Sequence, residues 1–81
     1  MRVRLYFDNS NYSIVAKKFL QENNIHFDEI DARTKEGFQK LLKHTQQNHV
    51  PAFELVRSHS INVIIGLNFE LLKRELGIKT I

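Results

Sequence analysis

The chain has 81 residues, with 12 Lys and Arg against 9 Asp and Glu, and it contains no cysteine. A chain of this length forms one domain, so we treat residues 1–81 as a single domain. Without cysteine the sequence cannot form disulfides, thiolate metal sites, iron–sulfur clusters or a reactive dithiol. We expect a cytoplasmic protein, because disulfide-free chains are typical of reducing compartments.

The distribution of charge and apolar residues gives no sign of a membrane or nucleic-acid partner. The basic start, Met1–Leu5, is followed by Asp8 after too short an apolar run for a signal peptide. No stretch approaches the roughly 18 apolar residues that a membrane span needs. The net charge of +3 is scattered in pairs such as Lys17-Lys18 among acidic residues. A nucleic-acid interface would instead gather its basic residues on one face.

The first half of the chain predicts a strand, a helix and a second strand. Apolar and polar residues alternate over residues 2–7, which is strand periodicity. A turn at Asp8–Asn11 then leads into a helix that ends at Asn23-Asn24. Its apolar residues recur at helical spacing: Ile14, Val15, Phe19 and Leu20. Residues 25–30 form the second strand, and the three elements suggest a right-handed parallel unit.

A second helix is predicted to begin after Thr34, which suits an N-cap, and to end within residues 46–48. Its expected buried stripe is Phe38, Leu41, Leu42 and Thr45. Gly37 in its first turn should cost up to about 1 kcal/mol relative to alanine.

The last third of the chain predicts a hairpin and a final helix. Residues 52–56 and 61–65 are β-rich and are separated by four polar residues, which favours an antiparallel hairpin. Asn68 is a good N-cap for a helix that ends at Gly77. The apolar stripe of this helix is Phe69, Leu72 and Leu76. The predicted class is α/β, with the order β-α-β-α-β-β-α, a four-stranded mixed sheet and helices on both faces.

This order and four local motifs resemble the glutaredoxin form of the thioredoxin fold. Ser10-Asn11-Tyr12-Ser13 stands where glutaredoxins carry Cys-Pro-Tyr-Cys after the first strand. Val50-Pro51 matches the Val-Pro before their third strand, and Gly66-Leu67-Asn68 matches their Gly-aromatic-Asp turn. Residues 23–31 look like the family's second strand.

The resemblance implies a site at the start of the first helix. Ser10 and Ser13 would occupy the positions of the catalytic cysteine pair. A cis Val50–Pro51 bond would leave the backbone before the proline free for a peptide-like ligand. The ligand groove would be lined by Asn11, Tyr12, Val50, Pro51, Gly66 and Asn68.

Serine changes the chemistry expected of this site. A thiol at a helix N-terminus has its pKa lowered, and its thiolate attacks disulfides. A serine hydroxyl without a base is a poor nucleophile. We therefore expect a relative of thiol–disulfide oxidoreductases that is redox-inert as written, so we do not expect an active enzyme. A natural cysteine-less member and a Cys-to-Ser variant both fit the sequence.

Two alternatives belong to other functional classes. The chain could be a non-catalytic peptide- or protein-binding regulatory module that uses the groove beside Val50–Pro51. It could also resemble the N-terminal domain of a glutathione transferase, but it lacks the helical second domain such enzymes need.

Cofactor and metal sites are not expected. Phe7 replaces a lysine that often contacts glutathione in the family, and the neutral Asn68 replaces an aspartate, so glutathione should bind weakly. The histidines lack metal-ligand spacing, and we expect them on the surface. A hydrolytic pair of Ser13 and His49 would need an orienting acid and an oxyanion hole, to which nothing in the sequence points.

Overall fold

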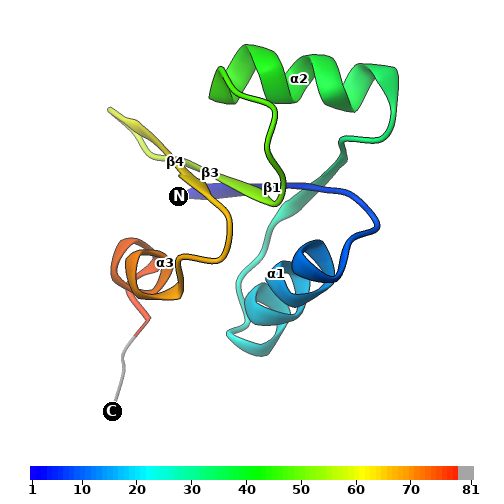
Figure 1. Ribbon diagram of the computed structural model, residues 1–81. Coiled ribbons are helices and arrows are strands. Elements are labelled where there is room, and N and C mark those ends of the chain that lie inside the picture. Colours follow the sequence, from blue (N-terminus) through cyan, green and yellow to red (C-terminus); the bar gives the residue numbers. More distant parts are fainter. Residues whose placement is uncertain (79–81) are drawn as a thin grey trace.

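The computed structural model describes residues 1–78 and contains one four-stranded mixed sheet with three helices (Figure 1). The order of elements confirms the prediction. The elements are β1 (Arg2–Phe7), α1 (Asn11–Glu22), β2 (Asp28–Asp31), α2 (Lys35–Thr45), β3 (Ala52–Val56), β4 (Ile61–Ile65) and α3 (Phe69–Leu76). None of the helices in residues 1–78 is long and apolar enough to cross a membrane.

The strands are arranged in the order β2-β1-β3-β4. β1 pairs parallel with β2 and antiparallel with β3, and β3 and β4 form an antiparallel hairpin. In the central pair, Arg4 lies opposite Glu54 and Tyr6 lies opposite Ala52. Both the parallel unit and the hairpin are therefore as predicted.

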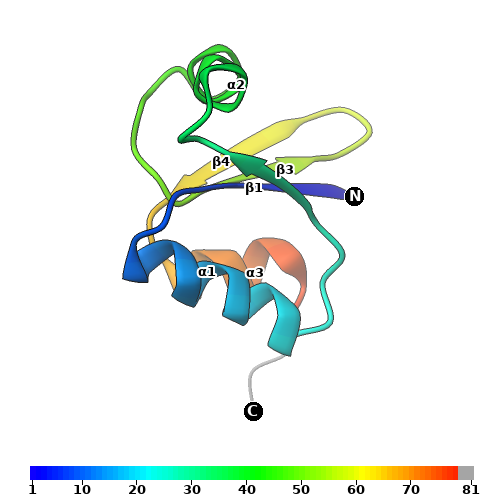
Figure 2. The same ribbon diagram turned by 90° about the vertical axis from the view of Figure 1, so that its right-hand side faces the viewer.

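Helices cover both faces of the sheet, with α1 and α3 on one side and α2 on the other (Figure 2). Because side chains alternate along a strand, β1 and β3 supply a core to each face. The larger core consists of Val3, Leu5, Ala16, Leu20, Phe53, Leu55, Ile64 and Leu72. The smaller core consists of Tyr6, Leu41 and Ala52.

The buried face of α1 is only partly as predicted. Leu20 is buried and Phe19 packs against the larger core, as expected. Ile14 and Val15, however, are 58% and 42% exposed, whereas Ser13 and Ala16 are buried. The helix is rotated because the Ser13 hydroxyl is hydrogen-bonded to Asp8 at the end of the preceding strand. Apolar spacing alone does not reveal that polar contact.

The predicted stripe of α2 is only partly correct. Leu41 is fully buried, but Phe38 and Leu42 are 40% and 42% exposed. A single helix covers this face of the sheet, so the sides of α2 have no neighbouring helix to pack against.

The second strand is shorter than predicted and begins at Asp28 instead of residue 25. Asn24 has a left-handed conformation (φ 57°), and the Ile25 N–H donates to the Leu20 carbonyl. The residues after α1 are therefore used to complete its C-terminal turn.

Gly37 is required by the fold, so treating it as a mild cost was wrong. The Thr34 hydroxyl donates to the Asp31 carbonyl and accepts from the Gly37 N–H, which draws the start of α2 against the end of β2. A Cβ at position 37 would overlap the Asp31 carbonyl oxygen.

Gly37→Ala should therefore lower the free energy of unfolding by about 1–3 kcal/mol, the usual cost of overpacking. Helix propensity alone would raise it by about 1 kcal/mol, so the two effects have opposite signs. Chemical denaturation measures the difference, with Gln39→Ala on the exposed side of α2 as the control. A stabilised Gly37→Ala variant would contradict the close approach.

Candidate functional site

Three loops meet at one edge of the sheet (Figures 1 and 2). Tyr6 near the end of β1 lies opposite Ala52 at the start of β3, and Ala52 lies opposite Ile65 at the end of β4. The β1–α1, α2–β3 and β4–α3 loops therefore leave the sheet at the same edge. The predicted residues in these loops, Ser10, Val50, Pro51, Gly66 and Asn68, are brought to this edge.

Ser10 is the N-cap of α1. Its backbone is extended, and its hydroxyl oxygen accepts from the Ser13 N–H at 3.2 Å. Asn11 and Tyr12 open the helix on the solvent side, and Tyr12 is 67% exposed. The predicted position of the first catalytic group is thus half-buried, beside the free N–H groups of a helix start.

Ser13 lies beneath this helix start and is 2% exposed. Its hydroxyl donates to the Asp8 carboxylate at 2.9 Å and accepts from the Asp8 N–H at 3.0 Å. The same carboxylate oxygen accepts from the Ser10 N–H at 2.9 Å. Hydrogen bonds from Ser10, with a smaller contribution from Ser13, hold the pKa of the Asp8 carboxyl below its ordinary value.

Asp8 is the site residue that the sequence analysis did not single out. It was assigned only to a turn. An Asp side chain often accepts a hydrogen bond from the backbone N–H two residues later, which forms an Asx turn. That local signal predicts the bond to Ser10, but not the bond to Ser13.

The α2–β3 and β4–α3 loops are hydrogen-bonded to each other. The Val50–Pro51 peptide bond is cis, as predicted, and the Pro51 carbonyl accepts from the Gly66 N–H at 2.8 Å. Within residues 1–78, the backbone N–H and C=O of Val50 form no hydrogen bond. Asn68 is exposed and caps α3, since its side-chain oxygen accepts from the Leu71 N–H.

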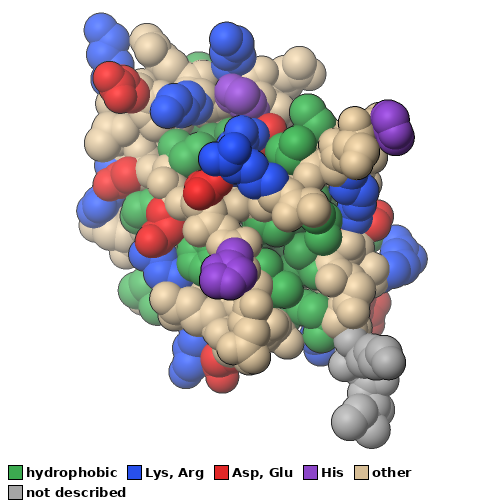
Figure 3. All heavy atoms as spheres, turned by 180° about the vertical axis from the view of Figure 1, so that it is seen from behind, with side chains coloured by type: hydrophobic (Ala, Val, Ile, Leu, Met, Phe, Trp, Pro, Cys, Tyr) green, Lys and Arg blue, Asp and Glu red, His purple; other side chains and the backbone are tan. Residues whose placement is uncertain are grey.

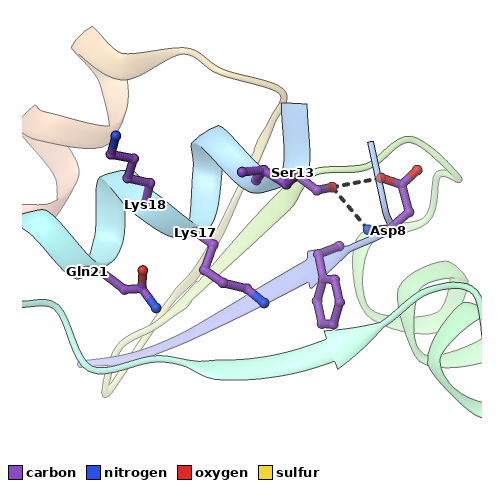
Figure 4. A pocket seen from close by; sticks show the side chains of 7 residues that line it. Asp8, Ser13, Lys17, Lys18 and Gln21 are labelled. Atoms are coloured by element: carbon purple, nitrogen blue, oxygen red, sulfur yellow. Dashed lines mark hydrogen bonds between the residues drawn. The ribbon is translucent and has the colours of Figure 1, made fainter. Parts of the chain in front are cut away.

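A cavity of about 430 Å³ lies beside α1 (Figure 4). Of the predicted site residues it includes only Ser13. The Lys17 ammonium lies 4.5 Å from the centre of the Phe7 ring and is paired with Glu29. The cavity is lined by Phe7, Asp8, Ser13, Ile14, Lys17, Lys18 and Gln21.

The histidines do not assemble a metal centre in the described part of the chain. No group of three or more His, Asp or Glu side chains in residues 1–78 could hold a metal ion. His26, His49 and His59 are exposed, and His44 contacts the buried Glu54.

The fold has a close counterpart among solved structures. A crystal structure of a mutant of the thioredoxin-like protein BC3987 superposes with a TM-score of 0.81. The match covers 96% of this chain and 97% of the other, at 21% sequence identity. This chain has the thioredoxin fold. No known protein family and no curated protein matches the sequence.

The thioredoxin-fold site makes stability depend on pH through Asp8. Because the pKa of Asp8 is lower in the folded state, its ionised form stabilises the protein above the unfolded pKa of about 4. This contribution is lost as the pH falls through the folded pKa. Asp8→Asn should therefore lower the free energy of unfolding at pH 7 and have progressively less effect below about pH 4.

Chemical denaturation of parent and variant at pH 7, 5 and 3 measures this dependence. Glu22→Gln, which removes an exposed carboxylate from α1, is the matched control. A difference between parent and Asp8→Asn that stays constant with pH would contradict the assigned role of the carboxylate.

Proposed function

We propose that this chain is a glutaredoxin-like protein, related to thiol–disulfide oxidoreductases, in which two serines replace the reactive cysteine pair. The observation that carries the proposal is the placement of Ser10. Its side chain caps α1 at the same edge of the sheet as the cis Val50–Pro51 turn. In this arrangement a sulfur at position 10 would meet the N-terminal N–H groups of a 12-residue helix.

Neither serine has what a hydroxyl nucleophile needs. Ser13 is buried, and its hydroxyl is already bonded to Asp8. Asp8 is a weak base, since its carboxyl is held below its ordinary pKa. We therefore expect no acyl-transfer or hydrolytic chemistry here and, without a thiol, no disulfide exchange.

The surroundings of Ser13 favour a natural cysteine-less protein over an altered enzyme. Its hydroxyl both donates to and accepts from Asp8. A thiol is a weaker donor and a weaker acceptor than a hydroxyl. A thiolate at position 13 would also face a carboxylate of the same sign. Serine thus suits this position better than cysteine does.

Weak glutathione binding is part of the proposal. The side-chain oxygen of Asn68 is used in capping α3, and the residue carries no charge. Phe7 offers a ring where the family often has an ammonium group, and the nearby Lys17 is paired with Glu29.

Placing a thiol at position 10 tests the proposal. In Ser10→Cys, the helix start should lower the thiol pKa well below the reference of about 8.5. Asp8→Asn in the same background should lower it further, because a neighbouring negative charge is removed. The rate of alkylation as a function of pH measures both values.

Ser58→Cys in the exposed β3–β4 loop is the control, and its thiol should titrate near the reference value. If the thiol of Ser10→Cys titrates at or above about 8.5, the helix start does not stabilise a thiolate, and the kinship with glutaredoxins ends at the fold.

A further inference from the structure

A second cavity lies on the opposite face of the sheet, between α2 and the strands β1 and β2. Its volume is about 300 Å³, near the lower end for ligand pockets. On the face in Figure 3, a His side chain lies among Lys, Arg and acidic side chains towards the α2 end of the molecule. We call this cavity the α2 cleft, and it is lined by Arg2, Arg4, Tyr6, Asp28, Ile30, Lys40 and His44.

A buried carboxylate contacts three of the side chains that line the α2 cleft. Glu54 on β3 is 1% exposed and accepts from the Tyr6 hydroxyl at 2.6 Å. Its other oxygen lies 3.2 Å from Nη1 of Arg4 and 3.4 Å from Nδ1 of His44. A buried charge is tolerated only when it is paired and hydrogen-bonded, and three partners meet that need here. Burial and then the bond to Glu54 raise the pKa of Tyr6, so its hydroxyl stays protonated as a donor.

Glu54 therefore acts as a positioning residue. It engages one ring nitrogen of His44 and leaves Nε2 on the far side of the ring, as a carboxylate does behind a metal-bound histidine. It also engages one amino group of Arg4, while a guanidinium carries five N–H donors. Both side chains are therefore held in place, and Arg4 keeps N–H donors that Glu54 does not use.

Two more cations complete the cleft. Lys40 stands one helical turn before His44 on α2, and no carboxylate in residues 1–78 forms an ion pair with it. Arg2 uses its Nε to bind Asp28. The residues that line the cleft, together with the buried Glu54, thus include three permanent cations and two carboxylates. The cations are Arg2, Arg4 and Lys40, and the carboxylates are Asp28 and Glu54. Positive charge and free N–H donors remain in excess.

We propose that the α2 cleft binds the phosphate group of a small phosphomonoester. A tetrahedral oxyanion accepts several N–H bonds at once, and guanidinium groups match its geometry bidentately. Two arginines from β1 and two side chains from α2 converge on the cavity, so donors reach it from both sides. This site is separate from the Ser10 edge and does not depend on the proposed function.

Titration of ¹⁵N-labelled protein with inorganic phosphate tests the α2 cleft, with chloride adjusted to keep the ionic strength constant. We expect saturable chemical-shift changes in β1, β2 and α2. Lys40→Gln should weaken binding about tenfold, the usual effect of losing one charge-assisted hydrogen bond. Lys43→Gln removes the same charge from α2 outside the cleft lining and should leave the affinity unchanged.

A second titration compares glycerol phosphate with glycerol. Glycerol phosphate should bind at least as tightly as inorganic phosphate, and glycerol should not bind. Shift changes that rise linearly without saturation, or equal weakening by Lys40→Gln and Lys43→Gln, would overturn the phosphate site. Weaker binding of glycerol phosphate than of inorganic phosphate would overturn its assignment to a phosphomonoester.

Discussion

The antiparallel pairing of β1 with β3 determines how every other part of the molecule is placed. These are the two interior strands, and their register puts Leu5 opposite Phe53 and Arg4 opposite Glu54. The first pair belongs to the core beneath α1 and α3, while the second faces α2. A shift of one residue would exchange the two faces and bury Arg4 in the apolar core. The apolar alternation of β1 opposes that shift.

The same register creates both the site at Ser10 and the α2 cleft. It joins the end of β1 to the start of β3, so that the helix start at Ser10 and the Val50–Pro51 turn share an edge of the sheet. It also sets Tyr6 and Arg4 beside Glu54, which then contacts His44 on α2. One strand pair thus supports the Ser10 site at its end and the α2 cleft on its face.

The fold could be predicted from the sequence because its signals are local. Alternation identified β1, Pro51 and the polar loop bounded the hairpin, and Thr34 and Asn68 cap their helices as expected. The orientation of α1 could not be predicted, since it depends on a hydrogen bond between Ser13 and Asp8 that apolar spacing does not encode. The Glu54 cluster was not foreseen either. Its members lie on three separate elements, β1, β3 and α2, and only the tertiary structure brings them together.

We propose that the start of α1 stabilises a thiolate, and that the hydroxyl oxygens of Ser10 and Ser13, in place of sulfur, keep this chain from thiol–disulfide exchange. The most direct measurement is the initial rate at which dithiothreitol reduces a small disulfide in the presence of the protein. The parent chain should match the blank without protein, because it contains no thiol. The Ser10→Cys/Ser13→Cys variant should exceed both the blank and a Ser58→Cys/Ser60→Cys control. Turnover by the parent, or a folded double variant no faster than that control, would contradict the proposed role of the α1 start.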